Sequence, residues 1–138
     1  MASDLYLRSV TYTIDLFKIT SINYRSKVAA DISEIRQGYE SAGIKIRTVR
    51  FNVIKIDASS RYELFTFIKH VEVLSEFAES IGIRWFNLAF DLVEVSEKSA
   101  KHTMYLAYEI MKRHSQSFIN LIVANDAVVN PMAAREAV

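Results

Sequence analysis

A helix-plus-strand unit occurs more than once in this chain of 138 residues, and it constrains the fold more than any other feature. Residues 40–45 read Glu-Ser-Ala-Gly-Ile-Lys, and residues 79–84 read Glu-Ser-Ile-Gly-Ile-Arg, 39 positions later. In each copy a glycine separates a helical pattern from an extended apolar segment, as is usual where a helix ends in the left-handed conformation. Strands that alternate with helices in this way indicate an α/β fold with a parallel sheet.

The individual elements follow from the spacing of apolar residues. Apolar and β-branched runs predict four strands, over residues 5–14, 44–56, 83–90 and 117–124. Apolar residues at steps of three and four predict three helices, over residues 22–42, 60–81 and 96–114. A fourth, short helix is predicted after Pro131, because proline suits the first helical position. The predicted N-cap residues are Ser21, Ser60, Ser96 and Asn130.

Each predicted strand has one apolar face and one polar face, because side chains alternate across a strand. The apolar face consists of Val10, Tyr12, Ile14, Val49, Phe51, Val53, Phe86, Leu88, Phe90, Ile119, Leu121 and Val123. Central strands of a doubly wound sheet are apolar on both faces, because helices cover both. The polar face therefore predicts that all helices lie on one side of the sheet. Right-handed crossovers in a constant sense then predict the strand order 1-2-3-4 and a curved sheet.

These inferences lead to a single α/β domain, residues 1–138, built as an incomplete (half) barrel. Four βα units rarely close a barrel alone, so the sheet is expected to be completed by something else. We therefore expect either a homo-oligomer or a partner chain that completes the barrel, with the polar face turned toward a lumen or that partner.

Composition excludes several function classes. The net charge of +1, from 17 basic and 16 acidic residues, gives no case for nucleic acid or an anionic membrane. The absence of cysteine removes disulfides, thiolate catalysis and cysteine metal sites, and it fits a reducing, cytoplasmic compartment. The sequence contains no GxGxxG or Walker A loop, no secretory signal pattern and no apolar run long enough for a transmembrane helix.

Polar residues recur at corresponding places in the predicted strands, and they are the candidate ligand-binding residues. Three strands carry an asparagine between apolar neighbours: Asn52, Asn87 and Asn120. An unpaired amide buried in a strand costs about 1–3 kcal/mol, so these amides need partners or water. All four strands end in an acid: Asp15, Asp57, Asp91 and Asp126. The carboxyl ends of parallel strands are where α/β sheets and barrels bind ligands.

The strand-end acids have two interpretations. Carboxylates that converge with amides could hold Mg²⁺ or Ca²⁺, and Arg50 beside Asn52 could bind an anion or carboxylate. Aspartate is also common where loops begin and near helix N-termini, and this structural interpretation is favoured. Arg50 is similarly expected to form a salt bridge with Asp15. No metal ligand set can be assigned, and no cofactor is named by the sequence.

Other chemically capable residues lie on the predicted helices. The histidines share no metal-ligand spacing and lie off the apolar stripes, so they are expected to face solvent: His70, His102 and His114. The third helix carries an adaptable apolar group, expected to be core with an oligomer contact as the alternative: Met104, Tyr105, Tyr108 and Met111.

Several segments resemble the N-terminal part of a prokaryotic domain-of-unknown-function family with a pyruvate formate-lyase-like ten-stranded α/β barrel. These segments are Arg8-Ser9-Val10-Thr11, Arg47-Thr48-Val49-Arg50, Phe77-Ala78-Glu79-Ser80-Ile81-Gly82-Ile83, Trp85-Phe86-Asn87 and Phe118-Ile119-Asn120-Leu121. The resemblance implies half of a large barrel, in a chain that is shorter than the family's members and is therefore truncated or split. It transfers no catalytic residues, and the radical chemistry of the fold needs cysteines that this chain lacks.

Two functions are compatible with these observations. The first is a half-barrel subunit that associates with itself or a partner and has no catalysis of its own. The alternative is an enzyme, or a protein that binds a small molecule or divalent cation, with its site at the C-terminal strand ends.

Overall fold

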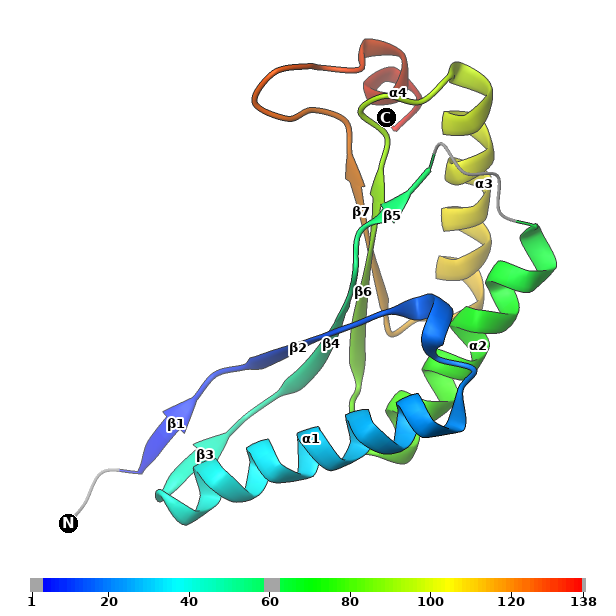
Figure 1. Cartoon of the computed structure of the whole chain (residues 1–138). Helices are drawn as coiled ribbons and strands as arrows, with labels where there is room; N and C mark the ends of the chain where they lie inside the picture. Colours follow the sequence, from blue (N-terminus) through cyan, green and yellow to red (C-terminus); the bar gives the residue numbers. More distant parts are fainter. Residues whose placement is uncertain (1–3, 59–62, 138) are drawn as a thin grey trace.

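A curved parallel sheet with helices on one side forms the centre of the molecule (Figure 1). The computed structural model describes residues 4–58 and 63–137. Four parallel strands lie side by side in chain order: β2 (Val10–Ile14), β4 (Val49–Val53), β6 (Trp85–Asp91) and β7 (Ser117–Ile122). The predicted order 1-2-3-4 is confirmed. Within the described residues β2 and β7 are the outer strands, a short strand after β4 pairs only with β6, and the sheet does not close into a barrel, as predicted for a half-barrel.

Two of the predicted strands are interrupted. The first divides into β1 (Leu5–Leu7) and β2, and the second into β3 (Ile44–Ile46), β4 and β5 (Ile56–Asp57). β1 pairs with β3 as a parallel two-stranded ribbon, whereas β5 pairs with β6. β6 begins opposite β4, so no third strand lies beside the ribbon among the described residues. Two-stranded ribbons twist more strongly than wider sheets, which accounts for the break between ribbon and sheet.

The helices begin and end largely where their capping residues predict. The 3₁₀ turn η1 (Leu16–Lys18) precedes α1 (Ile22–Ser41), and α2 (Leu64–Ser80), α3 (Glu97–Arg113) and α4 (Pro131–Glu136) follow. Three predicted N-caps are confirmed by side chains that accept from backbone N–H groups: Ser21, Ser96 and Asn130. The predicted cap at Ser60 lies outside the described residues; Glu63 caps α2. Gly43 and Gly82, both at φ +74°, follow α1 and α2 in the left-handed conformation.

The core lies between the helices and the apolar face of the sheet, which confirms that face as predicted. Ile14, Phe51 and Leu88, from three neighbouring strands, are completely buried. The same cluster contains residues of α1, α2 and α3: Val28, Ile32, Phe67, Ile68, Val71, Leu74, Ala78, Leu106, Ala107 and Ile110. Because all three helices contribute to one cluster on one side of the strands, the opposite face carries no helix layer (Figure 1).

A smaller cluster of Ala58, Leu92, Val95, Ala100 and Ala133 lies beside α4. Asn130 joins this region together: its Nδ2 donates to the carbonyls of Leu92 (2.8 Å) and Val95 (3.1 Å), and its Oδ1 accepts from the N–H of Ala133. Three bonds satisfy this buried amide, as burial requires.

Expectations for helix α3 need correction. Tyr105, Tyr108 and Met111 were expected in the core but are about half exposed. The buried stripe instead contains Ala100, Thr103, Leu106, Ala107 and Ile110. Thr103 is accommodated there because its hydroxyl donates to the carbonyl of Ser99 (2.9 Å).

The histidines do not all face solvent either. His102 is exposed, but His70 is half-buried, with Nδ1 2.7 Å from the carbonyl of Thr66. His114 is also half-buried, and its Nε2 has no hydrogen-bond partner among the described residues. Burial lowers the pKa of His114. The expectation missed His114 because the residue caps α3 at the turn into β7, where the chain folds back onto the core.

None of the helices in residues 4–58 and 63–137 is both long and apolar enough to cross a membrane.

Candidate functional site

The three asparagines predicted to share the polar face form a hydrogen-bonded row across β4, β6 and β7. Asn87 Nδ2 donates to Asn52 Oδ1 at 2.8 Å, and Asn120 Nδ2 donates to Asn87 Oδ1 at 2.9 Å. Asn52 and Asn87 are register partners, whereas Asn120 lies opposite Ala89 and reaches Asn87 diagonally. The amides are tolerated inside apolar strands because they pair with one another on the face that carries no helices.

The asparagine row leaves hydrogen-bonding capacity at both of its ends. An amide has two N–H donors and one carbonyl acceptor. Among the described residues, nothing bonds to the amide nitrogen of Asn52 or to the carbonyl oxygen of Asn120. A ligand lying along the row would therefore find a donor at β4 and an acceptor at β7.

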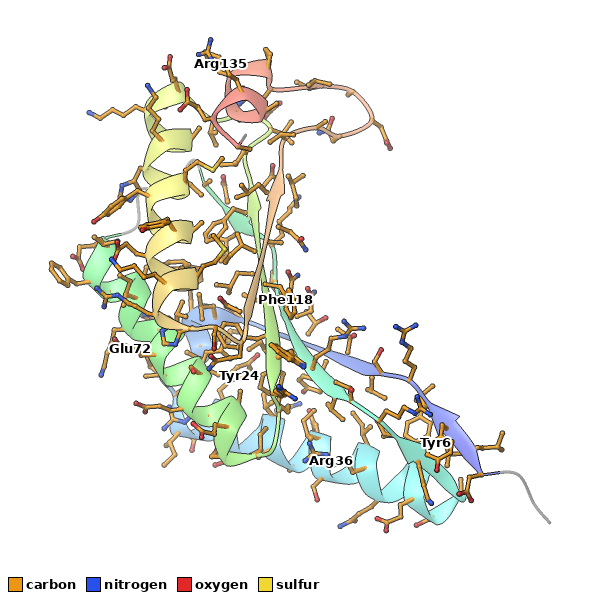
Figure 2. The ribbon with its side chains drawn as sticks, turned by 180° about the vertical axis from the view of Figure 1, so that it is seen from behind. Tyr6, Tyr24, Arg36, Glu72, Phe118 and Arg135 are labelled. Carbon is orange, nitrogen blue, oxygen red and sulfur yellow. The ribbon has the colours of Figure 1, made fainter. Side chains whose placement is uncertain are left out.

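A hollow of about 330 Å³ lies over the asparagine row. Its walls include Arg50, whose Nη2 donates to Ser9 Oγ at 2.9 Å, and the rings of Trp85 and Phe118, whose centroids are 5.4 Å apart. Phe118 is 55 % exposed, on the side of the sheet away from α2 and α3 (Figure 2). We call this space the amide hollow; it combines a guanidinium, an aromatic wall and an amide floor.

Two of the strand-end acids lie together. Asp57 and Asp91 are register partners on β5 and β6, and they line a second hollow of about 290 Å³ with Glu94 and Asn125. Lys55 forms an ion pair with Asp91 at 2.9 Å, and the N–H of Val93 donates to Asp91 Oδ1 at 3.1 Å. The Lys55 contact, followed by the Val93 bond, holds the pKa of Asp91 below its ordinary value. Asp91 is thus an ionised carboxylate whose charge is already compensated.

The other two strand-end acids line neither hollow. Asp15 caps η1, accepting from the N–H of Phe17 at 3.0 Å. Asp126 is exposed in the turn after β7, where Asn125 Oδ1 accepts from two backbone N–H groups. Both positions agree with the interpretation that aspartate begins loops.

The expected salt bridge between Arg50 and Asp15 is not formed; Arg50 contacts Ser9 instead. The register explains the difference: Arg50 lies opposite Thr11, four residues before Asp15 on β2. At about 3.3 Å per residue, that separation is beyond the reach of the guanidinium.

The divalent-cation interpretation lacks a ligand cluster. Within the part of the chain that the structure describes, no three His, Cys, Asp or Glu side chains converge in a way that could hold a metal ion.

A third hollow, of about 860 Å³, lies at the N-terminal ends of the strands, where β3 and the start of β6 are not paired. Its lining includes Arg36, Lys45, Arg47, Arg84 and Trp85. We call it the basic hollow; Trp85 lines both this hollow and the amide hollow.

Sequence reasoning missed this group of residues. The available signal was that aromatic side chains, Trp85 and Phe118, occur on the face that is otherwise polar. The prediction concerned the C-terminal strand ends, where ligands of α/β proteins usually bind, whereas these residues lie at the N-terminal ends.

The geometry defines a class: an α/β protein with a parallel sheet, one helix-covered face and one open face that carries polar hollows. None of the protein-family models, curated proteins or solved structures compared with the chain matches it. The resemblance to the ten-stranded barrel family therefore remains a prediction.

Proposed function

We propose that this chain is a half-barrel subunit that completes its barrel with a second copy of itself and has no catalysis of its own. The observation that carries the proposal is the open sheet. Helices cover one face, and β2 and β7 each pair on only one side among the described residues. Unpaired parallel edges with a half-exposed face are a template for further strand pairing.

The two edges suit each other, which favours a second copy over an unrelated partner. β2 has five residues and β7 has six, and both run in the same direction within the sheet. The β7 edge of one copy can therefore continue onto the β2 edge of the other as a parallel pair. Two curved sheets joined at both edges would enclose their open faces around one lumen, as in an isologous dimer.

The edge of β2 offers a direct test at Thr13. The N–H of Val10 donates to Thr48, and Ile14 accepts from Ile54, so these residues direct their backbone groups toward β4. By alternation along a parallel ladder, Thr13 directs its N–H outward. Thr13→Pro removes that outward donor without breaking a ladder bond inside the subunit. Thr13→Ala is the matched control, because it keeps the N–H group.

The measurement is the molar mass by light scattering over a wide range of protein concentration. We expect the wild type and Thr13→Ala to show twice the chain mass of 15.8 kDa and Thr13→Pro to remain monomeric with unchanged circular dichroism. A wild type that stays monomeric at all concentrations contradicts the proposal and directs the search to a different partner chain. A Thr13→Pro variant that still dimerises would show that β2 is not the interface.

A ligand-binding function at the C-terminal strand ends is the second candidate. The observation in its favour is the hollow that Asp57 and Asp91 share with Glu94. Thermal shift with MgCl₂, CaCl₂ and small organic acids tests it, with Asp57→Asn as the variant. A melting temperature that no additive raises, together with a stabilising Asp57→Asn substitution, would leave these acids as loop residues.

A further inference from the structure

Positive charge is concentrated at the N-terminal end of the open face. The basic and amide hollows are lined by five cationic side chains, Arg36, Lys45, Arg47, Arg50 and Arg84, and by two acidic ones, Asp4 and Glu40. The whole chain has nearly equal numbers of basic and acidic residues. The net charge of +1 therefore hides a local excess, because the acids Asp57, Asp91 and Glu94 gather at the opposite end.

None of the four arginines that line the hollows has a carboxylate within ion-pair distance among the described residues, and three of them, Arg47, Arg50 and Arg84, also have no side-chain bond to a backbone carbonyl there. Arg47 lies over the ring of Tyr6, with 5.0 Å between the guanidinium carbon and the ring centroid. Arg84 lies over Trp85 at 4.7 Å. A guanidinium stacked on a ring keeps its in-plane N–H donors, and these match the oxygens of a phosphate.

The other two cations are already engaged. Arg36 donates to the carbonyl of Ile81 at 2.8 Å, and Lys45 pairs with Asp4 at 3.2 Å. Arg47, Arg50 and Arg84 therefore carry the positive charge that no carboxylate compensates, and the one hydrogen bond of Arg50, to Ser9 Oγ, goes to a neutral hydroxyl. Trp85 lines both hollows.

An aromatic platform lies between these cations. Trp85 and Phe118 come from adjacent strands, and their rings are tilted by 53° at a centroid distance of 5.4 Å. One face of Trp85 is covered by Arg84, whereas Phe118 is more than half exposed. An exposed phenyl ring on a sheet, next to unpaired arginines, is the arrangement on which proteins stack nucleobases.

We propose that the basic and amide hollows bind a nucleotide unit, with its phosphate on the arginines and its base on the Trp85–Phe118 pair. The asparagine row adds hydrogen-bonding groups of the kind that contact base edges, since a side-chain amide offers both a donor and an acceptor. A purely anionic ligand would leave the aromatic pair unused, and a neutral planar ligand would leave the arginines unpaired. The same chemistry belongs to a free nucleotide and to one unit of a single strand.

The site does not depend on the proposed dimer, because both hollows are formed within one chain. Closure of a barrel over the open face would restrict the site to a free nucleotide, whereas an open face would also admit a strand. Binding is therefore measured in the wild type and in Thr13→Pro, which separates a failure of this proposal from a failure of the dimer.

Trp85 provides the readout, because it is the only tryptophan in the chain. The probes are AMP, single-stranded oligo(A) of about eight nucleotides and inorganic tripolyphosphate, which carries charge without a ring. We expect AMP and oligo(A) to quench the fluorescence saturably and tripolyphosphate not to quench it. If the affinity for oligo(A) exceeds that for AMP by more than the number of nucleotides in the oligonucleotide, the ligand is a strand. If the two affinities are equal per nucleotide, the ligand is the free nucleotide.

Matched variants separate stacking from charge. Phe118→Ala should weaken binding by about fivefold or more, the low end of what loss of one stacking ring costs. Tyr108→Ala, an equally exposed aromatic on α3, should leave binding unchanged. Arg84→Gln should weaken binding and lower the slope of log affinity against log salt by about 0.7, whereas Arg113→Gln on α3 should not.

Three results would overturn the proposal. One is the absence of saturable quenching by both AMP and oligo(A), in the wild type and in Thr13→Pro. Another is full displacement of oligo(A) by tripolyphosphate together with unchanged binding by Phe118→Ala, which would mean that charge alone accounts for binding. The third is equal weakening by Tyr108→Ala and Phe118→Ala, with melting temperatures confirming that both variants fold.

Discussion

Adjacent residues Asn87 and Leu88 test the two-faced sheet, because they point to opposite sides of β6. Leu88 is completely buried against the helices, and truncation of such a leucine costs about 3 kcal/mol through lost burial and the remaining cavity. Asn87 lies half-exposed on the open face, where it takes part in both hydrogen bonds of the asparagine row. Water can replace much of what it loses, so Asn87→Ala should cost about 1 kcal/mol.

These free energies translate into separable melting temperatures. For a chain of this size, 1 kcal/mol corresponds to roughly 3–4 °C, so we expect a decrease of about 10 °C for Leu88→Ala and about 3 °C for Asn87→Ala. The assay is thermal and urea unfolding followed by circular dichroism, performed in the Thr13→Pro background so that association does not contribute. The urea m-value should stay constant, which would show that only stability has changed.

Equal destabilisation by Leu88→Ala and Asn87→Ala would refute the reasoning. It would mean that helices or another part of the chain cover both faces of β6, so that the amides are as deeply buried as the leucine. The proposal of a half-barrel subunit would then be wrong, because it depends on an open face of the sheet.

Three further predictions follow from local geometry. Gly38 lies inside α1 with open space at its Cβ position, so Gly38→Ala should stabilise the protein by up to about 1 kcal/mol in urea unfolding. Gly43 also has open space at its Cβ position, but its φ is +74°, so Gly43→Ala should destabilise the protein by a similar amount. Burial lowers the pKa of His114, so the unfolded state binds the proton more readily; stability should fall as pH drops below about 6.5, and His114→Gln should make this fall smaller. Asn130→Ala leaves the buried carbonyls of Leu92 and Val95 without a donor and should cost about 3 kcal/mol in thermal unfolding; a loss under 1 kcal/mol would mean that water replaces the amide.

Periodicity predicted the layers of the fold because burial acts on every residue of a face at once. Ile14, Phe51 and Leu88 belong to an apolar set that is removed from water only if helices cover that one face of the sheet. The left-handed glycines were equally predictable, since Gly43 and Gly82 stand where a side chain would be strained. The breaks within the long strands were not predictable, because they depend on where β6 begins, which is a property of the sheet rather than of the segment.

The candidate site was predictable only in part. Parity placed Asn52, Asn87 and Asn120 on one face, but not the diagonal bond between Asn120 and Asn87, which depends on register. The partner of Arg50 was wrong for the same reason. The ion pair of Asp91 with Lys55 comes from the loop between β4 and β5, whose path no periodic pattern specifies.

The two-stranded ribbon of β1 and β3 has a kinetic consequence. It extends beyond the core over the end of α1, and Leu5 and Tyr6 are at least half exposed (Figure 1). The ribbon has few buried neighbours, so its amide protons should exchange through local fraying. The amide protons of β4 and β6 should exchange only through global unfolding. Arg47 follows this ribbon and Arg84 follows α2, so the two sides of the basic hollow belong to segments of unequal stability. We therefore expect fraying of the ribbon to change the width of the basic hollow between Arg47 and Arg84.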